Sequence, residues 1–208
     1  MSAEDAKLAT LRAQVHAELA RAPRATPWWV GAAVLVGLNL AAAAGALLVL
    51  SSNAAMSSHS QLRWAIAGGL LIIIAAGSVL GLRPGRQAPR VALMVVAGAV
   101  FALAWLLGAE ARPEMPFWAG TSCATTECLV SMVPLVTGLL LLTRFGFDPL
   151  RTALVGMSSA GVGLLALHLH CGNGAWGHVA MFHALPCAVM VGALLIVRRA
   201  MPSKTFAP

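Results

Sequence analysis

Six apolar segments take up most of this 208-residue chain, and they constrain its fold more than any other feature. Most of them approach the ~20 residues that a helix needs to cross about 30 Å of hydrocarbon. A backbone in lipid must satisfy its own hydrogen bonds, and a bundle of helices does this most simply. The sequence therefore predicts an all-α polytopic membrane protein, a bundle of six transmembrane helices, at Trp28 to Leu50, Leu62 to Leu82, Arg90 to Ala109, Cys128 to Leu142, Leu150 to His170 and Trp176 to Val197.

Basic residues alternate between the gaps, and this pattern predicts the orientation of the bundle. Twelve of the 14 Lys and Arg residues precede the first span, follow the last, or occupy the second and fourth gaps. Short cytoplasmic loops of membrane proteins carry such an excess. We therefore expect both termini in the cytoplasm and outward-facing gaps at 51–61, 110–127 and 171–175. The net charge of +7 then reflects orientation and does not indicate nucleic-acid binding.

Residues 1–27 form a cytoplasmic segment that is distinct from the transmembrane domain, expected at 28–199, and from a tail at 200–208. We expect no cleavable signal peptide, because no small-residue cleavage site follows a brief apolar core. A helix of about four turns is marginal alone in water, so its apolar stripe should be covered. It lies either on the inner leaflet or in a groove of a cytoplasmic protein. The stripe consists of four residues near helical spacing, Leu8, Leu11, Val15 and Leu19.

Three of the four cysteines fall at the predicted outer side. Cys123 lies in the third gap, Cys128 begins the fourth span, and Cys171 follows the fifth. The fourth and fifth spans form a hairpin, so a Cys128 to Cys171 disulfide is geometrically plausible if the Cα atoms approach within ~7 Å. A permanent structural bridge and a reversible switch both remain open.

The same region carries ligands that suit zinc or copper, because thiolates and imidazoles bind these ions. On a helix His168 and Cys171 share a face while His170 points away, so not all donors converge unless the helix ends before His170. An interfacial position with access to water is the simpler explanation for any one histidine alone. The candidate metal ligands are Cys128, His170, Cys171 and His178.

The sixth span has its own polar pair. His183 and Cys187 are four residues apart and share a helix face, and Pro186 between them frees a backbone carbonyl. The modest interpretation is a hydrogen bond between spans, with Asn39 or Thr137 as the partner. We expect no proton or electron pathway, because the predicted spans lack internal Asp, Glu or Lys.

The stretch from Cys128 to Arg199 contains a series of motifs in a fixed order. They are Glu127-Cys128-Leu129, Pro134, Leu169-His170-Cys171, Gly172-Asn173-Gly174 and His183-Ala184-Leu185-Pro186. This series resembles the NrsF family of six-span bacterial inner-membrane anti-sigma factors. The resemblance covers about the last 80 residues, and the first half agrees only in length and span count. Cys123 and Cys187 fall outside the pattern, as does Gly172, where proline is expected.

The resemblance implies a regulator of a bacterial inner membrane without enzymatic activity. Such a protein holds a cytoplasmic extracytoplasmic-function sigma factor inactive and does not itself contact nucleic acid. Cys128 and Cys171 would sense metal or oxidative stress. No cofactor is required, although zinc, copper or another soft metal could bind transiently. The possible auxiliary residues are Cys123, His168, His170, His178, His183 and Cys187, and the partner-binding residues are Leu8, Leu11, Val15 and Leu19.

Two other classes of function stay open from the residues. A membrane thiol redox protein would use Cys123 and Cys128, but acidic neighbours, Glu114 and Glu127, disfavour a reactive thiolate. A metal transporter would need ligands stepping across the bilayer, whereas these ligands gather in the outer third and stop at Cys187.

Overall fold

The computed structural model describes residues 3–21, 26–50, 61–85, 87–108, 117–172 and 175–203, and within these ranges it consists of helices without a strand. Five of the helices are long and apolar enough to cross a membrane. The chain is therefore a multi-pass helical membrane protein, and the predicted all-α fold is confirmed. The five apolar stretches are Trp28–Leu50, Trp64–Leu82, Gly120–Leu142, Pro149–His170 and Trp176–Ala200.

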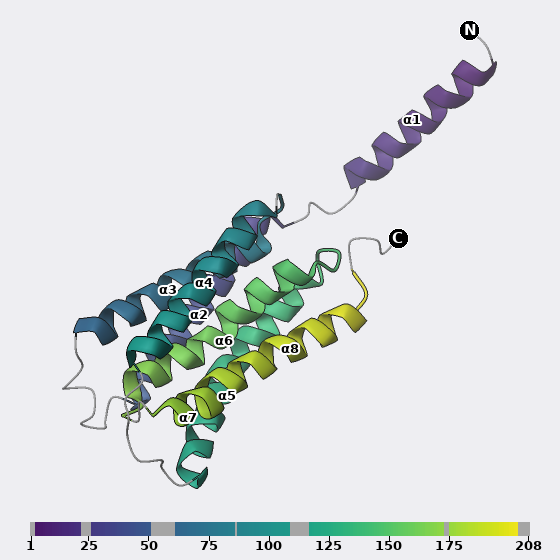
Figure 1. Ribbon diagram of the computed structural model, residues 1–208. Coiled ribbons are helices and arrows are strands. Elements are labelled where there is room, and N and C mark those ends of the chain that lie inside the picture. Colours follow the sequence, from purple (N-terminus) through teal and green to yellow (C-terminus); the bar gives the residue numbers. More distant parts are fainter. Residues whose placement is uncertain are drawn as a thin grey trace.

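Among the described residues, six long helices form an elongated bundle (Figure 1). The sixth, α4, has a shorter described apolar stretch, Ala88–Val100, so its passage through the membrane stays a prediction. Residues 51–60 of the predicted gap at 51–61, residues 110–116 of the gap at 110–127 and residues 173–174 of the gap at 171–175 lie outside the described residues. The bundle helices are α2 (Trp28–Leu50), α3 (Gln61–Leu82), α4 (Ala88–Gly108), α5 (Phe117–Leu142), α6 (Pro149–His170) and α8 (Leu185–Ala200), the last preceded by α7 (Trp176–Val179) and the π-helical turn η2 (Ala180–Ala184).

Helix α6 is the centre of the bundle. It packs against α2, α3, α5 and α8, and 83% of its apolar part is buried. Small residues allow this close approach. A Cβ atom on Gly163 would lie 2.5 Å from the carbonyl oxygen of Glu127 in α5, and one on Gly81 of α3 would lie 2.6 Å from the Val155 side chain of α6. The 22 residues of α6 span about 33 Å, which matches the thickness of the hydrocarbon core.

One end of the bundle is joined by buried arginines, and we name it the arginine end. Arg90, whose side chain is 3% exposed, forms a 2.8 Å ion pair with Asp148 and donates to the carbonyl oxygens of Leu80 and Arg83. Asp148 also caps the N-terminus of α6 by accepting hydrogen bonds from two backbone N–H groups of its first turn. The loop before α6 is thereby tied to the loop between α3 and α4.

Arg198 closes the other side of the arginine end. Its side chain is buried, and it donates to the carbonyl oxygens of Leu142 at 3.2 Å, Met201 at 3.0 Å and Phe145. These bonds join the C-terminus of α8 to the end of α5. The described basic residues of the second and fourth gaps therefore gather at one end of the bundle, as the charge pattern predicts, while the sidedness in a membrane stays a prediction.

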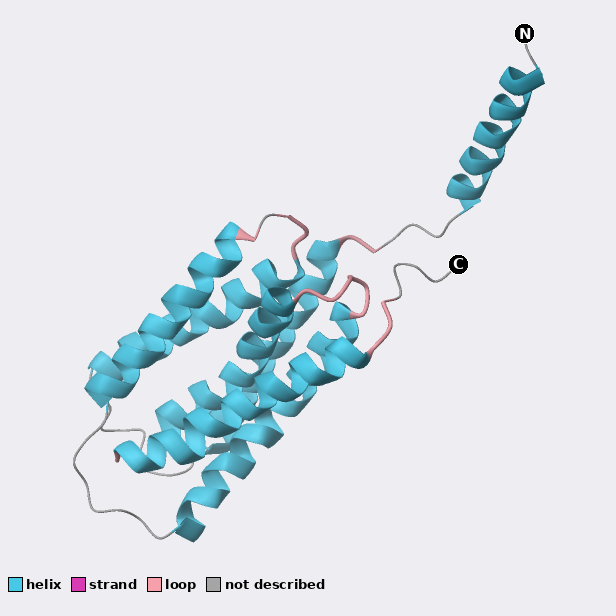
Figure 2. Ribbon diagram, turned by 45° about the vertical axis from the view of Figure 1, so that its right-hand side comes forward, coloured by secondary structure: helices cyan, strands magenta, loops and turns pink. Residues whose placement is uncertain are grey.

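Helix α1 (Ala3–Arg21) lies apart from the bundle, beyond the arginine end (Figures 1 and 2). Leu8, Leu11 and Val15 are about half exposed there. The predicted amphipathic segment is thus a helix, and three members of its apolar stripe are accessible. Leu19 belongs to the same helix, but its side chain lies outside the described part of the structure.

Candidate metal and thiol site

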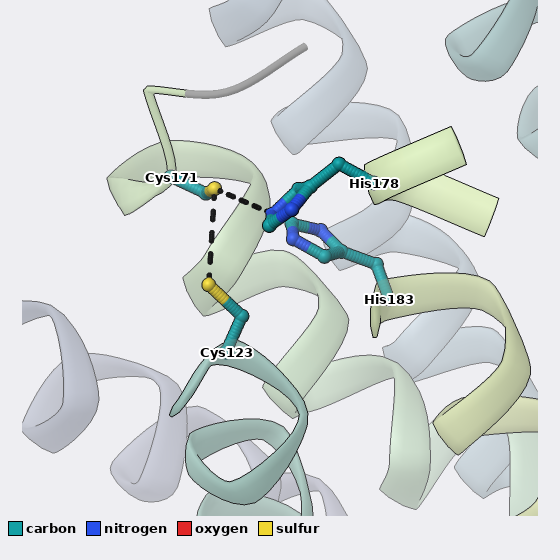
Figure 3. Close-up of side chains that lie close together, drawn as sticks. All are labelled: Cys123, Cys171, His178 and His183. Atoms are coloured by element: carbon teal, nitrogen blue, oxygen red, sulfur yellow. Dashed lines mark hydrogen bonds between the residues drawn. The ribbon is translucent and has the colours of Figure 1, made fainter. Parts of the chain in front are cut away.

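Two cysteines and two histidines meet at the end of the bundle opposite the arginines (Figure 3). Cys123 comes from α5, Cys171 from the C-cap of α6, His178 from α7 and His183 from η2. One possible ligand atom from each residue lies within 4.8 Å of the other three. We name these four residues the thiol–imidazole cluster, and the end that holds them the cluster end.

The distances within the cluster are short. The sulfur atoms of Cys123 and Cys171 are 4.0 Å apart, and the Cys171 sulfur lies 3.3 Å from Nε2 of His178. The rings of His178 and His183 meet edge to face, with centroids 5.1 Å apart. Both histidines are buried and both cysteines are half-buried. All four cysteines of the chain are free thiols in this structure.

A π-helical turn brings the two histidines onto one face. His183 follows His178 by five positions, and in a regular α-helix the two side chains would point about 140° apart. The turn at Ala180–Ala184 instead closes with a hydrogen bond from the N–H of Leu185 to the carbonyl of Ala180, five residues earlier. Residues five apart then align. Pro186 follows this turn and has no N–H to donate to the carbonyl of Phe182, which favours the wider turn.

Cys123 joins the cluster because α5 begins earlier than the sequence predicts. The fourth span was expected to start at Cys128, but α5 starts at Phe117 and its apolar stretch at Gly120. That expectation was wrong because the polar run from Thr121 to Thr126 has the composition of a loop. Two of these hydroxyl groups bond inside the helix, since Thr121 and Thr125 donate to carbonyl oxygens three and four residues earlier.

The structure therefore gathers a different set of donors from the one proposed by sequence. Cys171 and His178 are common to both sets, whereas Cys123 and His183 take the places of Cys128 and His170. Cys128 lies five residues beyond Cys123 on α5, about 140° around the helix, so both cannot face the same point.

The remaining predicted residues lie outside the cluster. His168 and His170 are in the last turn of α6, one turn before and one residue before Cys171. Cys187 packs against an apolar cluster that includes Leu35 and Leu194. Asn39, a proposed partner of His183, instead donates to the Ser78 hydroxyl at 3.0 Å. Nε2 of His183 has no hydrogen-bond partner among the described residues.

A buried carboxyl group lies one turn deeper than Cys123. Glu127 is fully buried, and neither of its carboxyl oxygens has a partner among the described residues. The expectation that the spans lack internal acidic residues was wrong here, because the apolar stretch of α5 includes Glu127. Gly163 and Ser131 hold the neighbouring backbones together: the hydroxyl of Ser131 donates to the carbonyl of Ala160 and accepts from the N–H of Gly163.

Close packing also fixes the outer turn of α5 against the histidines. A Cβ atom on Gly120 would lie 2.2 Å from the Phe182 ring, so only glycine permits this approach. The Phe182 ring in turn lies 5.3 Å from that of His178. The cluster therefore rests on three elements that pack directly on one another, and its chemistry is that of two thiols and two imidazoles, which can hold a metal ion or form a disulfide.

Part of this chain is similar to a curated protein. The carotenogenesis protein CarR of Myxococcus xanthus is 32% identical over 118 residues, which cover 57% of this chain and 51% of CarR. This chain thus spans about half the length of the curated relative that it matches. No family model matches the chain, and no solved structure is similar to it.

Proposed function

We propose that this protein is a membrane-bound anti-sigma factor of the NrsF type. It holds a cytoplasmic extracytoplasmic-function sigma factor at the inner face of a bacterial inner membrane and releases it when the cluster end reacts with metal or oxidant. The observation that carries the proposal is the separation of two unlike ends by one buried helix: two thiols beside two imidazoles at one end of α6 and an accessible amphipathic helix beyond the other. A regulator that reports an outside signal to an inside partner needs both.

The accessible stripe of α1 supports a protein partner. Leu8, Leu11 and Val15 present half-exposed apolar side chains on one face, and an isolated helix of 19 residues gains stability when such a face is covered. The inner loops contribute less than their charge suggests, because Arg90 and Arg198 are buried in contacts with their own chain. Arg83 and Arg144 are exposed and remain accessible to a partner.

Helix α6 provides the physical connection between the two ends. Its C-terminus carries Cys171 and its N-terminus carries Asp148, which pairs with Arg90. A reaction that pulls Cys171 toward α5 or η2 acts on a helix that packs against four others. Coupling energies of ~1 to 3 kcal/mol are usual for such regulation and are enough to change the bound fraction of a partner.

The relative is consistent with a regulatory role. CarR is named as a carotenogenesis protein. The competing proposal, a metal transporter, has less support, because the thiol–imidazole cluster lies at one end of the bundle rather than along it. We also propose that the protein is a regulator rather than an enzyme.

The test is recovery of a sigma factor with the tagged protein from detergent-solubilised membranes, identified by mass spectrometry. Replacement of Leu8 and Leu11 by Asp should abolish recovery, whereas Ala13→Asp, on the opposite face of α1, should not. Zinc or peroxide should reduce recovery from the wild type. Equal recovery with all three forms of α1, or no sigma factor from any of them, would contradict the proposal.

A further inference from the structure

The thiol–imidazole cluster has the dimensions of a tetrahedral metal centre. With Zn–S bonds of about 2.3 Å and Zn–N bonds of about 2.0 Å, tetrahedral angles separate two sulfur ligands by about 3.8 Å and a sulfur from a nitrogen by about 3.5 Å. The structure has 4.0 Å between the sulfurs of Cys123 and Cys171, and 3.3 Å between the Cys171 sulfur and Nε2 of His178. These two pairs therefore need to move by only a few tenths of an ångström, and the other donor pairs lie within 4.8 Å.

His183 supplies the independent sign of a ligand. Its side chain is 4% exposed, yet Nε2 has no hydrogen-bond partner among the described residues. Buried polar atoms are nearly always satisfied, so an orphaned imidazole nitrogen beside two thiols and a second imidazole indicates a missing bond. His183 is also one of the four residues whose possible ligand atoms all lie within 4.8 Å of one another.

The electrostatics favour a divalent cation. Two thiolates neutralise its charge, which a half-buried site at a membrane end requires. Cys171 caps the C-terminus of α6, where the helix dipole is negative and stabilises a positive charge. The neighbouring residues Gly172 and Trp176 are exposed, so an ion can reach the site from the end of the bundle.

We infer that Cys123, Cys171, His178 and His183 bind one divalent ion of the zinc class in a closed tetrahedral site that joins α5, α6 and η2. The role of this site as the place where the regulator receives its signal rests on the proposed function. The binding of the metal ion itself does not depend on that function. Bound metal would fix the outer ends of three helices relative to one another, since each contributes at least one ligand.

The test is titration of the purified, reduced, full-length protein in detergent with Co²⁺ and then Zn²⁺. The wild type should bind one Co²⁺ with the visible bands of a tetrahedral thiolate complex, and Zn²⁺ should displace it. Cys123→Ser and His183→Ala should each weaken Zn²⁺ binding by more than about 100-fold, the upper loss usual for residues that only hydrogen-bond to a metal ligand. The matched controls Cys128→Ser and His170→Ala should bind as the wild type does.

A second measurement on the wild type avoids any dependence on the folding of variants. Zn²⁺ should protect Cys123 and Cys171 from alkylation by N-ethylmaleimide, as read by mass spectrometry, and should leave the alkylation of Cys128 unchanged. No stoichiometric binding, or protection of Cys128 in place of Cys123, would overturn the inference. Zinc binding without recovery of a sigma factor would support the inference and contradict the proposed function. Recovery of a sigma factor without zinc binding would support the proposed function and contradict the inference.

Discussion

The two ends of the bundle bury polar side chains in opposite ways. At the arginine end, Arg90 and Arg198 together form six hydrogen bonds, all with groups of this chain. At the cluster end, Nε2 of His183 has no partner among the described residues, and one turn below Cys123 the same holds for both carboxyl oxygens of Glu127. A buried polar group without a partner costs free energy that a paired one does not. Arg90 and Arg198 are therefore paired at the arginine end, where only Nε of Arg151 is buried without a hydrogen-bond partner among the described residues, whereas the cluster end has room for an additional ligand or bond.

This contrast also assigns different mechanical roles to the two ends. A closed network of carbonyl and carboxylate contacts holds α6 and α8 in place at the arginine end. The cluster end joins its helices through side chains that can change their bonding. A signal at the cluster end would then move helices against a fixed opposite end, and the following changes test that difference.

Oxidation should cause the largest change, and it should be confined to the cluster end. Hydrogen peroxide should join Cys123 to Cys171, each thiol losing a hydrogen while the peroxide is reduced to two water molecules. Closing this loop should raise the free energy of unfolding by about 4 kcal/mol on chain entropy alone. The shift is measured by SDS-induced unfolding of the detergent-solubilised protein before and after oxidation.

Variants at the two cysteines of α5 separate this bond from the alternative. Cys128→Ser should show the same shift as the wild type, and Cys123→Ser should show none. Prior addition of Zn²⁺ should slow the oxidation, because metal-bound thiolates are less accessible. A bridge between Cys128 and Cys171 in peptide maps would show that the cluster contains the wrong cysteine.

Loss of Arg198 should cause the next largest effect, at the other end. Arg198→Ala leaves the carbonyl oxygens of Leu142 and Phe145 without their charged donor, and we expect a loss of about 3 kcal/mol in the free energy of unfolding. Arg199→Ala, next to it but exposed, should have little effect. Similar losses for the two variants would mean that Arg198 acts through charge at the membrane surface and not through its buried bonds.

The sequence predicts the helices well because their lengths and apolar character follow from the membrane. The start of α5 was missed because Thr121, Ser122 and Thr125 have low helix propensity, and a few internal hydrogen bonds and the fit of Gly120 against Phe182 outweigh it. The position where α5 starts determines whether Cys123 belongs to a loop or to the cluster. The sequence-based prediction named Cys128 and not Cys123 as a metal ligand because it placed this start too late.

The site depends on two features that spacing does not reveal. In a regular α-helix the side chains of His178 and His183 would point in different directions, and the π turn at Ala180–Ala184 aligns them. Pro186 was a visible signal for an irregular backbone but not for its form. At the arginine end, the charge pattern predicts which end holds Arg90 and Arg198, but their burial depends on carbonyl positions that only the folded chain provides.

A methyl group at the contact between α5 and α6 should disturb the cluster end selectively. In Gly163→Ala the new Cβ would lie 2.5 Å from the Glu127 carbonyl oxygen, and backbone atoms cannot yield as a flexible side chain can. We expect a loss of about 2 kcal/mol in the free energy of unfolding and slower peroxide cross-linking of Cys123 to Cys171, because the helices separate. Gly37→Ala, where a Cβ meets nothing within 4 Å, is the matched control and should be neutral or slightly stabilising. Unchanged cross-linking in Gly163→Ala would show that the outer turn of α5 is positioned independently of this contact.

The smallest effect should come from the interaction between Arg90 and Asp148, and it shows how firmly the arginine end is fixed. A double-mutant cycle with Arg90→Ala and Asp148→Asn should give a coupling energy of about 1 kcal/mol, since the aspartate is 21% exposed and partly screened by water. A parallel cycle with the exposed Arg83 in place of Arg90 should give almost none. If the coupling instead changes when Zn²⁺ is added to the wild-type cluster, the arginine end responds to the cluster end through α6 and is not a fixed point. The same measurement therefore decides whether a signal from the thiols ends in a movement of the outer helices or passes through the whole bundle to the inner face.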